Sequence, residues 1–68
     1  MTNMVREKIE KQLEKAINHV NKGGCKELRE ANAMNNFAGY LKAMEDMGFI
    51  NSEEYFEYVN KFVDFCYE

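Results

Sequence analysis

Residues 47–55 read MGFINSEEY and mark the point where one helix ends and the next begins. Gly48 supplies the positive φ with which helices commonly terminate, since glycine has no Cβ to clash in that conformation. Asn51 is a favourable N-cap, and Glu54 follows three residues later, as a capping box requires. The pattern therefore predicts a helix end near Gly48 and a new helix just after Asn51.

A second boundary lies at Gly23 and Gly24, because paired glycines end a helix and let the chain turn. We therefore predict helices over about 3–21, 26–47 and 52–67. The apolar residues of the first helix fall in one arc of about 120°, with charged residues opposite, as an amphipathic surface helix requires. They are Val5, Ile9, Leu13, Ala16, Ile17 and Val20.

The middle helix carries its apolar stripe at Met34, Phe37, Leu41 and Met44. Leu28 projects to the opposite side of the same helix. Two explanations are open: the helix is broken before about residue 32, or Leu28 packs against something other than the neighbours of the stripe.

The C-terminal helix holds six of the nine aromatic residues of the chain. Its apolar residues cover about 200° of the helical wheel, whereas one packing interface needs roughly half of that arc. Either a three-helix core covers the helix on both flanks, or one flank is a contact surface for another chain. Large aromatic side chains dominate binding energies at such surfaces. The candidate anchors are Phe56, Tyr58, Phe65 and Tyr67, together with Leu28 on the middle helix.

Three helices with short connections predict one all-α domain over residues 1–68, an up-down-up antiparallel bundle. A chain of 68 residues buries only about 60% of the surface that its unfolded form exposes, so its core is marginal. Association with a partner chain is the simplest source of further stability. We therefore expect a homo-oligomer or a complex with a larger protein.

The net charge of −3 is distributed unevenly. Five basic and three acidic residues give residues 1–22 a charge of +2, whereas one basic and five acidic residues give residues 52–68 a charge of −4. Carboxylates repel the phosphate backbone, so direct nucleic-acid binding through the C-terminal helix is not expected. In the first helix, glutamates alternate with lysines, and we expect i,i+4 pairing on a solvated face.

The C-terminal charges suggest an alternative function. An acidic helix face can dock on a basic, nucleic-acid-binding site of a larger protein and compete with its substrate, as small inhibitors from phages or mobile elements do. The residues of this acidic face are Glu53, Glu57, Asp64 and Glu68.

Few residues in the chain are suited to catalysis, and we predict neither enzymatic activity nor a cofactor. An up-down-up bundle brings His19, Cys25 and Cys66 towards one end, with Glu68 close by. The two cysteines are then free thiols, a disulfide, or ligands of a zinc site with His19. The chain lacks the CxxC and HxxxH spacings that arrange metal ligands in pairs. A thiol- or metal-responsive regulator is therefore a weaker alternative.

The N-terminal residues are too charged for a secretory signal, and no apolar run approaches the roughly 18 residues that span a bilayer. We therefore expect a cytoplasmic protein without membrane contact. The function that the sequence favours is a small non-catalytic, self-associating interaction or regulatory module that acts through its aromatic C-terminal helix.

Overall fold

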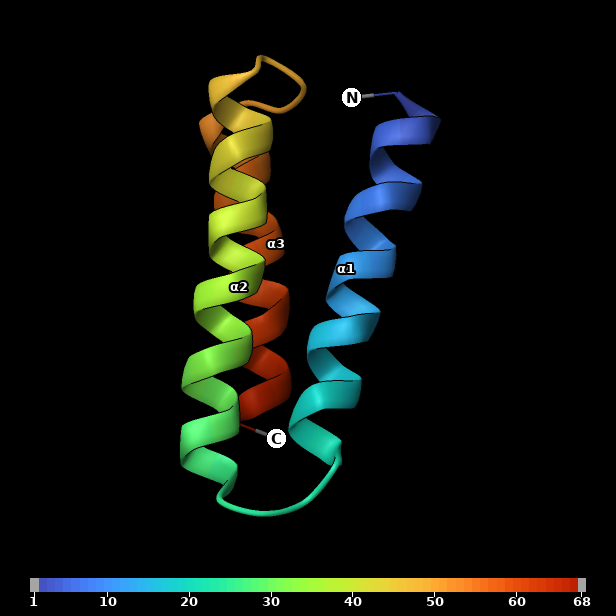
Figure 1. Ribbon diagram of the computed structural model, residues 1–68. Coiled ribbons are helices and arrows are strands. Elements are labelled where there is room, and N and C mark those ends of the chain that lie inside the picture. The colour runs from blue at the N-terminus through green and yellow to red at the C-terminus, as the bar shows by residue number, and fades with distance from the viewer. Residues whose placement is uncertain (1, 68) are drawn as a thin grey trace.

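The computed structural model describes residues 2–67, which form three helices and no strand. Helix α1 spans Asn3–Asn21, α2 spans Lys26–Asp46 and α3 spans Ser52–Cys66. The helices run alternately down, up and down along a bundle that measures 36 × 19 × 18 Å (Figure 1). The predicted all-α bundle and the predicted helix bounds are confirmed to within one residue.

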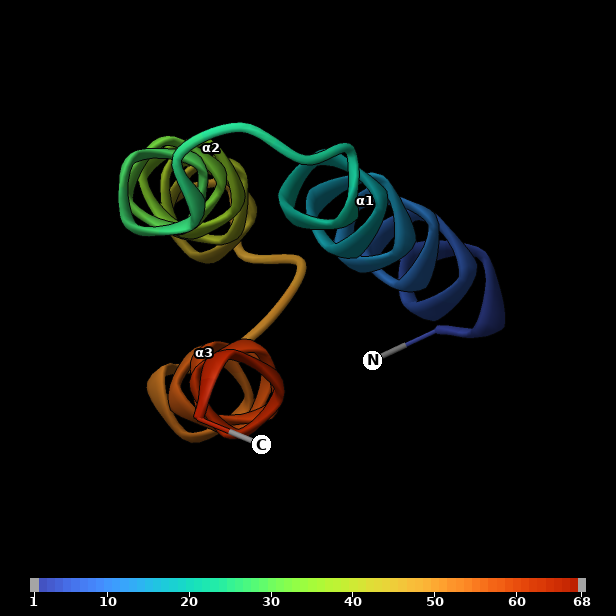
Figure 2. The same ribbon diagram turned by 90° about the horizontal axis from the view of Figure 1, so that it is seen from below.

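Helix α2 lies at the centre of the packing. Both α1 and α3 pack against α2, whereas α1 and α3 touch each other only sparsely. Seen from the end of the bundle, α1 is inclined away from the other two helices, and its N-terminal end lies farthest from them (Figure 2). The bundle is therefore more open between α1 and α3 than on either side of α2.

The core is centred on one fully buried side chain from each helix, and further buried residues surround these three. Ile9, Leu41 and Phe62 are fully buried, and Phe37 is nearly so. These side chains occupy the apolar stripes that the sequence places on the three helices, so burial of those stripes supplies the main favourable term in folding.

The turn between α2 and α3 contains the predicted capping box. The Asn51 Oδ1 atom accepts a hydrogen bond from the Glu54 backbone N–H at 2.8 Å, and Glu54 Oε1 accepts one from the Asn51 N–H at 3.0 Å. Gly48 has a φ of 81°, as expected for a helix terminus. Ile50, which precedes the cap, is buried in the core. The turn is therefore held by the burial of Ile50 and by the hydrogen bonds of the capping box.

Glu45 joins the end of α2 to the start of α3. Its Oε2 atom accepts a hydrogen bond from the Ser52 hydroxyl at 2.7 Å, and its Oε1 atom lies 2.8 Å from the Lys42 ammonium. The hydrogen bonds from Lys42 and Ser52 lower the pKa of Glu45. Glu45 thus remains an anion that accepts from both groups at neutral pH.

The structure overturns one of the two explanations for Leu28, the broken helix. Helix α2 is continuous from Lys26, so it is not broken before residue 32. Leu28 is 61% exposed and packs against no part of the core. A single leucine is readily accommodated on a solvent-facing helix turn, so its position opposite the stripe requires no break in the helix.

Candidate interaction surface

Three aromatic side chains fix the inner face of α3. The ring of the buried Phe62 lies 6.1 Å from that of Phe37 on α2 and 6.2 Å from that of Phe65, measured between centroids. Tyr58 is 4% exposed, and the Lys61 ammonium lies 4.8 Å from its ring centroid. Burial raises the pKa of Tyr58, so its phenol is neutral at physiological pH.

The burial of Tyr58 corrects its assignment as an interface anchor. Tyr58 faces α1, where it lines a hollow with Arg6 and Glu10, and is therefore covered by the fold itself. Phe65, on the same flank of α3, is half-buried and packs against the core. The flank of α3 that carries Tyr58 and Phe65 is thus covered by the rest of the chain.

The other flank of α3 is open to solvent. Phe56 is 60% exposed and Tyr67 is 87% exposed, with the half-buried Val63 between them on the same side of the helix. The ring of Phe56 makes an edge contact with that of Tyr55, at 5.1 Å between centroids. We call Phe56, Val63 and Tyr67 the aromatic flank. These side chains remain available to another molecule.

A groove between α2 and α3 borders the aromatic flank. It has a volume of about 480 Å³, and its lining includes Val63, Cys66 and Tyr67 from α3 and its C-cap. From α2 it receives the half-buried Met34 and two carboxylates, Glu27 and Glu30. An apolar floor with an acidic rim suits a helix or loop that presents an apolar side chain beside a basic one.

Cys66 lies in this groove as a protonated thiol. Burial raises its pKa to about 11, and Glu30, which accepts a hydrogen bond from the thiol, adds to the increase, whereas Lys26 opposes it. The thiolate is the reactive form of cysteine. Cys66 therefore acts as a small apolar side chain at neutral pH, and not as a nucleophile.

The acidic face is retained on the outer side of α3. Glu53, Glu57 and Asp64 are all exposed and lie within an arc of about 40° at 100° per residue. Glu68, the fourth predicted member, lies outside the described residues. Glu54 belongs to the capping box instead.

The residues considered for thiol or metal chemistry do not form a cluster. Cys25 and Cys66 are both free thiols. Within residues 2–67, no group of three His, Cys, Asp or Glu side chains is placed to hold a metal ion. The backbone carbonyl of His19 accepts a hydrogen bond from Arg29 at 3.2 Å, which ties the end of α1 to α2.

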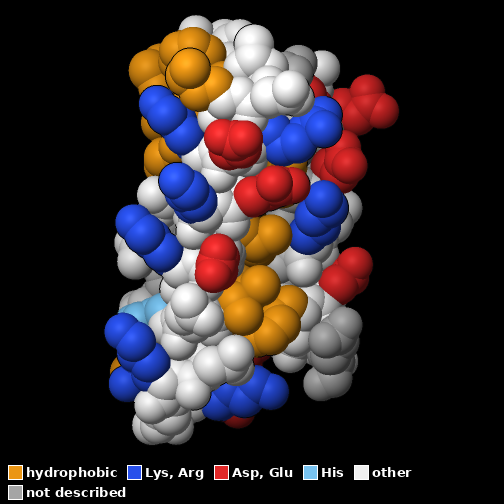
Figure 3. All heavy atoms as spheres, turned by 90° about the vertical axis from the view of Figure 1, so that its right-hand side faces the viewer, with side chains coloured by type: hydrophobic (Ala, Val, Ile, Leu, Met, Phe, Trp, Pro, Cys, Tyr) orange, Lys and Arg blue, Asp and Glu red, His pale blue; other side chains and the backbone are white. Residues whose placement is uncertain are grey.

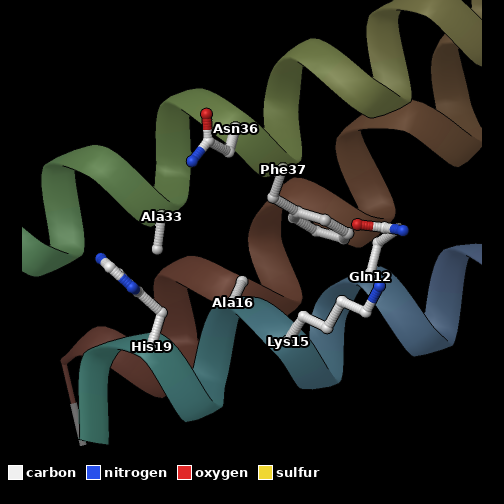
Figure 4. A pocket seen from close by; sticks show the side chains of 7 residues that line it. All are labelled: Gln12, Lys15, Ala16, His19, Ala33, Asn36 and Phe37. Atoms are coloured by element: carbon white, nitrogen blue, oxygen red, sulfur yellow. The ribbon is translucent and has the colours of Figure 1, made fainter. Parts of the chain in front are cut away.

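His19 instead borders a hollow of about 370 Å³ between α1 and α2. Figure 4 shows Ala16, Ala33 and Phe37 around this hollow, with Gln12, Lys15, His19 and Asn36 at its margin. The buried Nε2 atom of His19 has no hydrogen-bond partner among the described residues. The side chains of Lys15 and His19 point to opposite ends of the hollow (Figure 4), so they do not converge on one ligand position.

One apolar surface was not predicted from the sequence. Met4, Met47 and Phe49 are exposed and line a hollow of about 350 Å³ with Tyr40 and Met44. These residues come from the start of α1, from α2 and from the turn after α2. The available signal was weak, because Met4 stands on the polar side of its helix and Phe49 in a turn.

Comparison with known proteins gives no relative for this chain. No protein-family model matches it, and neither the curated proteins nor the solved structures contain a significant match. Within residues 2–67, no helix combines the length and the apolar character that crossing a membrane requires.

Proposed function

We propose that this chain is a cytoplasmic, non-catalytic interaction module that associates with protein, including further copies of itself, through the aromatic flank of α3. One observation carries the proposal: Phe56 and Tyr67 are 60% and 87% exposed on the same side of one helix. Aromatic side chains contribute large contact areas at a low entropic cost, and they are enriched among the residues that dominate binding energy.

The α2–α3 groove extends this surface. Met34 and Val63 provide an apolar floor next to Tyr67, and methionine adapts its shape readily to a partner. A partner side chain that enters the groove is surrounded by apolar atoms, while Glu27 and Glu30 at its margin favour a basic neighbour. The surface therefore combines affinity from apolar contact with selectivity from charge.

The proposal is tested by sedimentation equilibrium over a wide range of protein concentrations. We expect the average mass of the wild type to rise with concentration, and the double variant Phe56→Ser, Tyr67→Ser to remain monomeric. Phe49→Ser is the matched control, since Phe49 is also exposed but lies at the turn between α2 and α3. A double variant that associates as strongly as the wild type would contradict the role of the aromatic flank.

A second candidate function is supported by the acidic face. Glu53, Glu57 and Asp64 are exposed together on α3, which suits docking on a basic, nucleic-acid-binding site of a larger protein. Replacement of all three by their amides is then expected to lower the salt concentration at which the protein elutes from a polylysine column. The control replaces Glu7, Glu10 and Glu14 of α1 by glutamine, which changes the net charge equally. If both variants elute at equally lowered salt concentrations, the net charge and not the acidic face determines binding to polylysine.

A further inference from the structure

Two rows of exposed charges on different helices have the same spacing. The basic row on α1 and its C-cap consists of Lys11, Lys15 and Lys22, and the acidic row on α3 consists of Glu53, Glu57 and Asp64. In both rows the second residue follows the first by four positions and the third follows the second by seven. Each row falls within an arc of about 40°, with steps along the axis of about 6 and about 10 Å.

Within residues 2–67, neither row forms an ion pair. All six side chains are exposed. Across residues 2–67, the ion pairs between side chains join Lys42 to Glu45 and Asp46. The i,i+4 pairing expected on α1 is therefore wrong. Its lysines and its glutamates form two adjacent rows along the helix, which Figure 3 shows as a column of basic side chains at the left with acidic side chains beside it.

The fold prevents the two rows from meeting. On α1, the lysines lie opposite the core residues Ile9 and Val20, and on α3 the acidic row lies opposite Phe62. Both rows are exposed and lie on different sides of the bundle, with Lys15 bordering the α1–α2 hollow and Glu57 the hollow beside Tyr58. Their opposite charges can be brought together only when the rows belong to different copies of the chain.

We propose that two copies of this chain associate with the basic row of one on the acidic row of the other, the two helices running parallel. This inference rests on the self-association proposed above and adds its register: Lys11 meets Glu53, Lys15 meets Glu57 and Lys22 meets Asp64. Antiparallel helices would set steps of four and seven residues against steps of seven and four, so the three pairs could not all form.

The aromatic flank supplies apolar contact beside these pairs. Phe56 and Tyr67 adjoin the acidic row on α3, where the long aliphatic stems of the lysines can cover their rings. Exposed ion pairs contribute little affinity on their own, but they select the partner and fix its orientation. The contact uses different surfaces on the two copies, so each copy retains one free row and association continues into a ring or an open chain.

The test reverses each row separately. The first variant is Lys11→Glu, Lys15→Glu, Lys22→Glu, and the second is Glu53→Lys, Glu57→Lys, Asp64→Lys. Each carries two rows of the same sign, and we expect sedimentation equilibrium in about 50 mM salt to show association at least about tenfold weaker than that of the wild type. An equimolar mixture of the two variants regains association, because every row again meets its opposite.

A control variant distinguishes the pairing of the two rows from self-association through the aromatic flank alone. We expect reversal of Glu7, Glu10 and Glu14, which form the neighbouring acidic row of α1, to leave association much less affected than reversal of either paired row. A mixture no stronger than its components overturns the pairing of rows, while the proposed function stands if the wild type associates and the Phe56→Ser, Tyr67→Ser variant does not. A wild type that stays monomeric overturns both. If reversal of the lysines spares association but abolishes binding to a single-stranded oligonucleotide, the basic row serves a polyanion and the proposal is wrong.

Discussion

At the scale of single residues, Cys66 shows how burial changes the chemistry of a side chain. The groove around it raises its pKa from the ordinary 9.0 to about 11. The folded state therefore favours the neutral thiol. Its contribution to stability is complete below pH 9 and is lost as the pH rises through about 11, because the unfolded chain releases the proton first.

We expect Cys66 to react slowly with iodoacetamide at neutral pH and faster as the pH approaches 11. The variant Cys25→Ser isolates this reaction, since Cys25 is the other free cysteine and is exposed. The pH dependence of the alkylation rate measures the pKa of Cys66. A midpoint at or below 9 would show that the groove does not protect the thiol.

Tyr58 and Phe56 illustrate which residue assignments the sequence supports. Both are aromatic, lie two positions apart and flank the same stripe, so composition and periodicity treat them alike. In the structure one is 4% exposed and the other 60%. The difference arises from the direction in which α3 faces α1, and this direction depends on the packing of distant parts of the chain.

At the scale of elements, the helix bounds were predictable because their signals are local. Gly48 adopts the positive φ expected of it, and Asn51 and Glu54 cap α3 through their own side chains. A capping box needs only four consecutive residues. The continuity of α2 was harder to predict from the sequence. An apolar residue off the stripe, such as Leu28, is compatible both with a broken helix and with an exposed position on a continuous one.

The capping box is expected to stabilise the whole bundle. Substitution Asn51→Ala removes the acceptor for the Glu54 N–H, and we expect the free energy of unfolding to fall by about 1 kcal/mol. Denaturation by urea measures the loss. Asn35→Ala is the control, since Asn35 is exposed in the interior of α2 and caps no helix. Equal effects of the two changes would contradict a capping role.

The hollow lined by Met4, Met47 and Phe49 could not be predicted from the separate elements. Its residues belong to two helices and a turn, so no single segment of the sequence contains the pattern that they form in the fold. The equal spacing of the two charged rows can be read from the sequence. Their outward directions, however, depend on the face that each helix presents to the core.

At the scale of the whole molecule, the proposed self-association would couple the stability of the small core to the protein concentration. Association that involves only the folded chain raises the melting temperature as the protein concentration rises. For a domain of this size, we expect an increase of several degrees over a hundredfold concentration range. Differential scanning calorimetry measures it. The Phe56→Ser, Tyr67→Ser variant should melt at one temperature throughout, and a concentration-independent wild type would contradict self-association.

The sparse contact between α1 and α3 has a consequence for the rate at which the chain folds. Most packing joins helices that are neighbours in the sequence, so the native contacts close short loops and the contact order is low. Helical proteins of this kind fold in microseconds to milliseconds. The chain also contains no proline, so no slow prolyl isomerisation delays refolding. We therefore expect a single fast kinetic phase, in which α2 acquires both of its partners before the chain has time to aggregate.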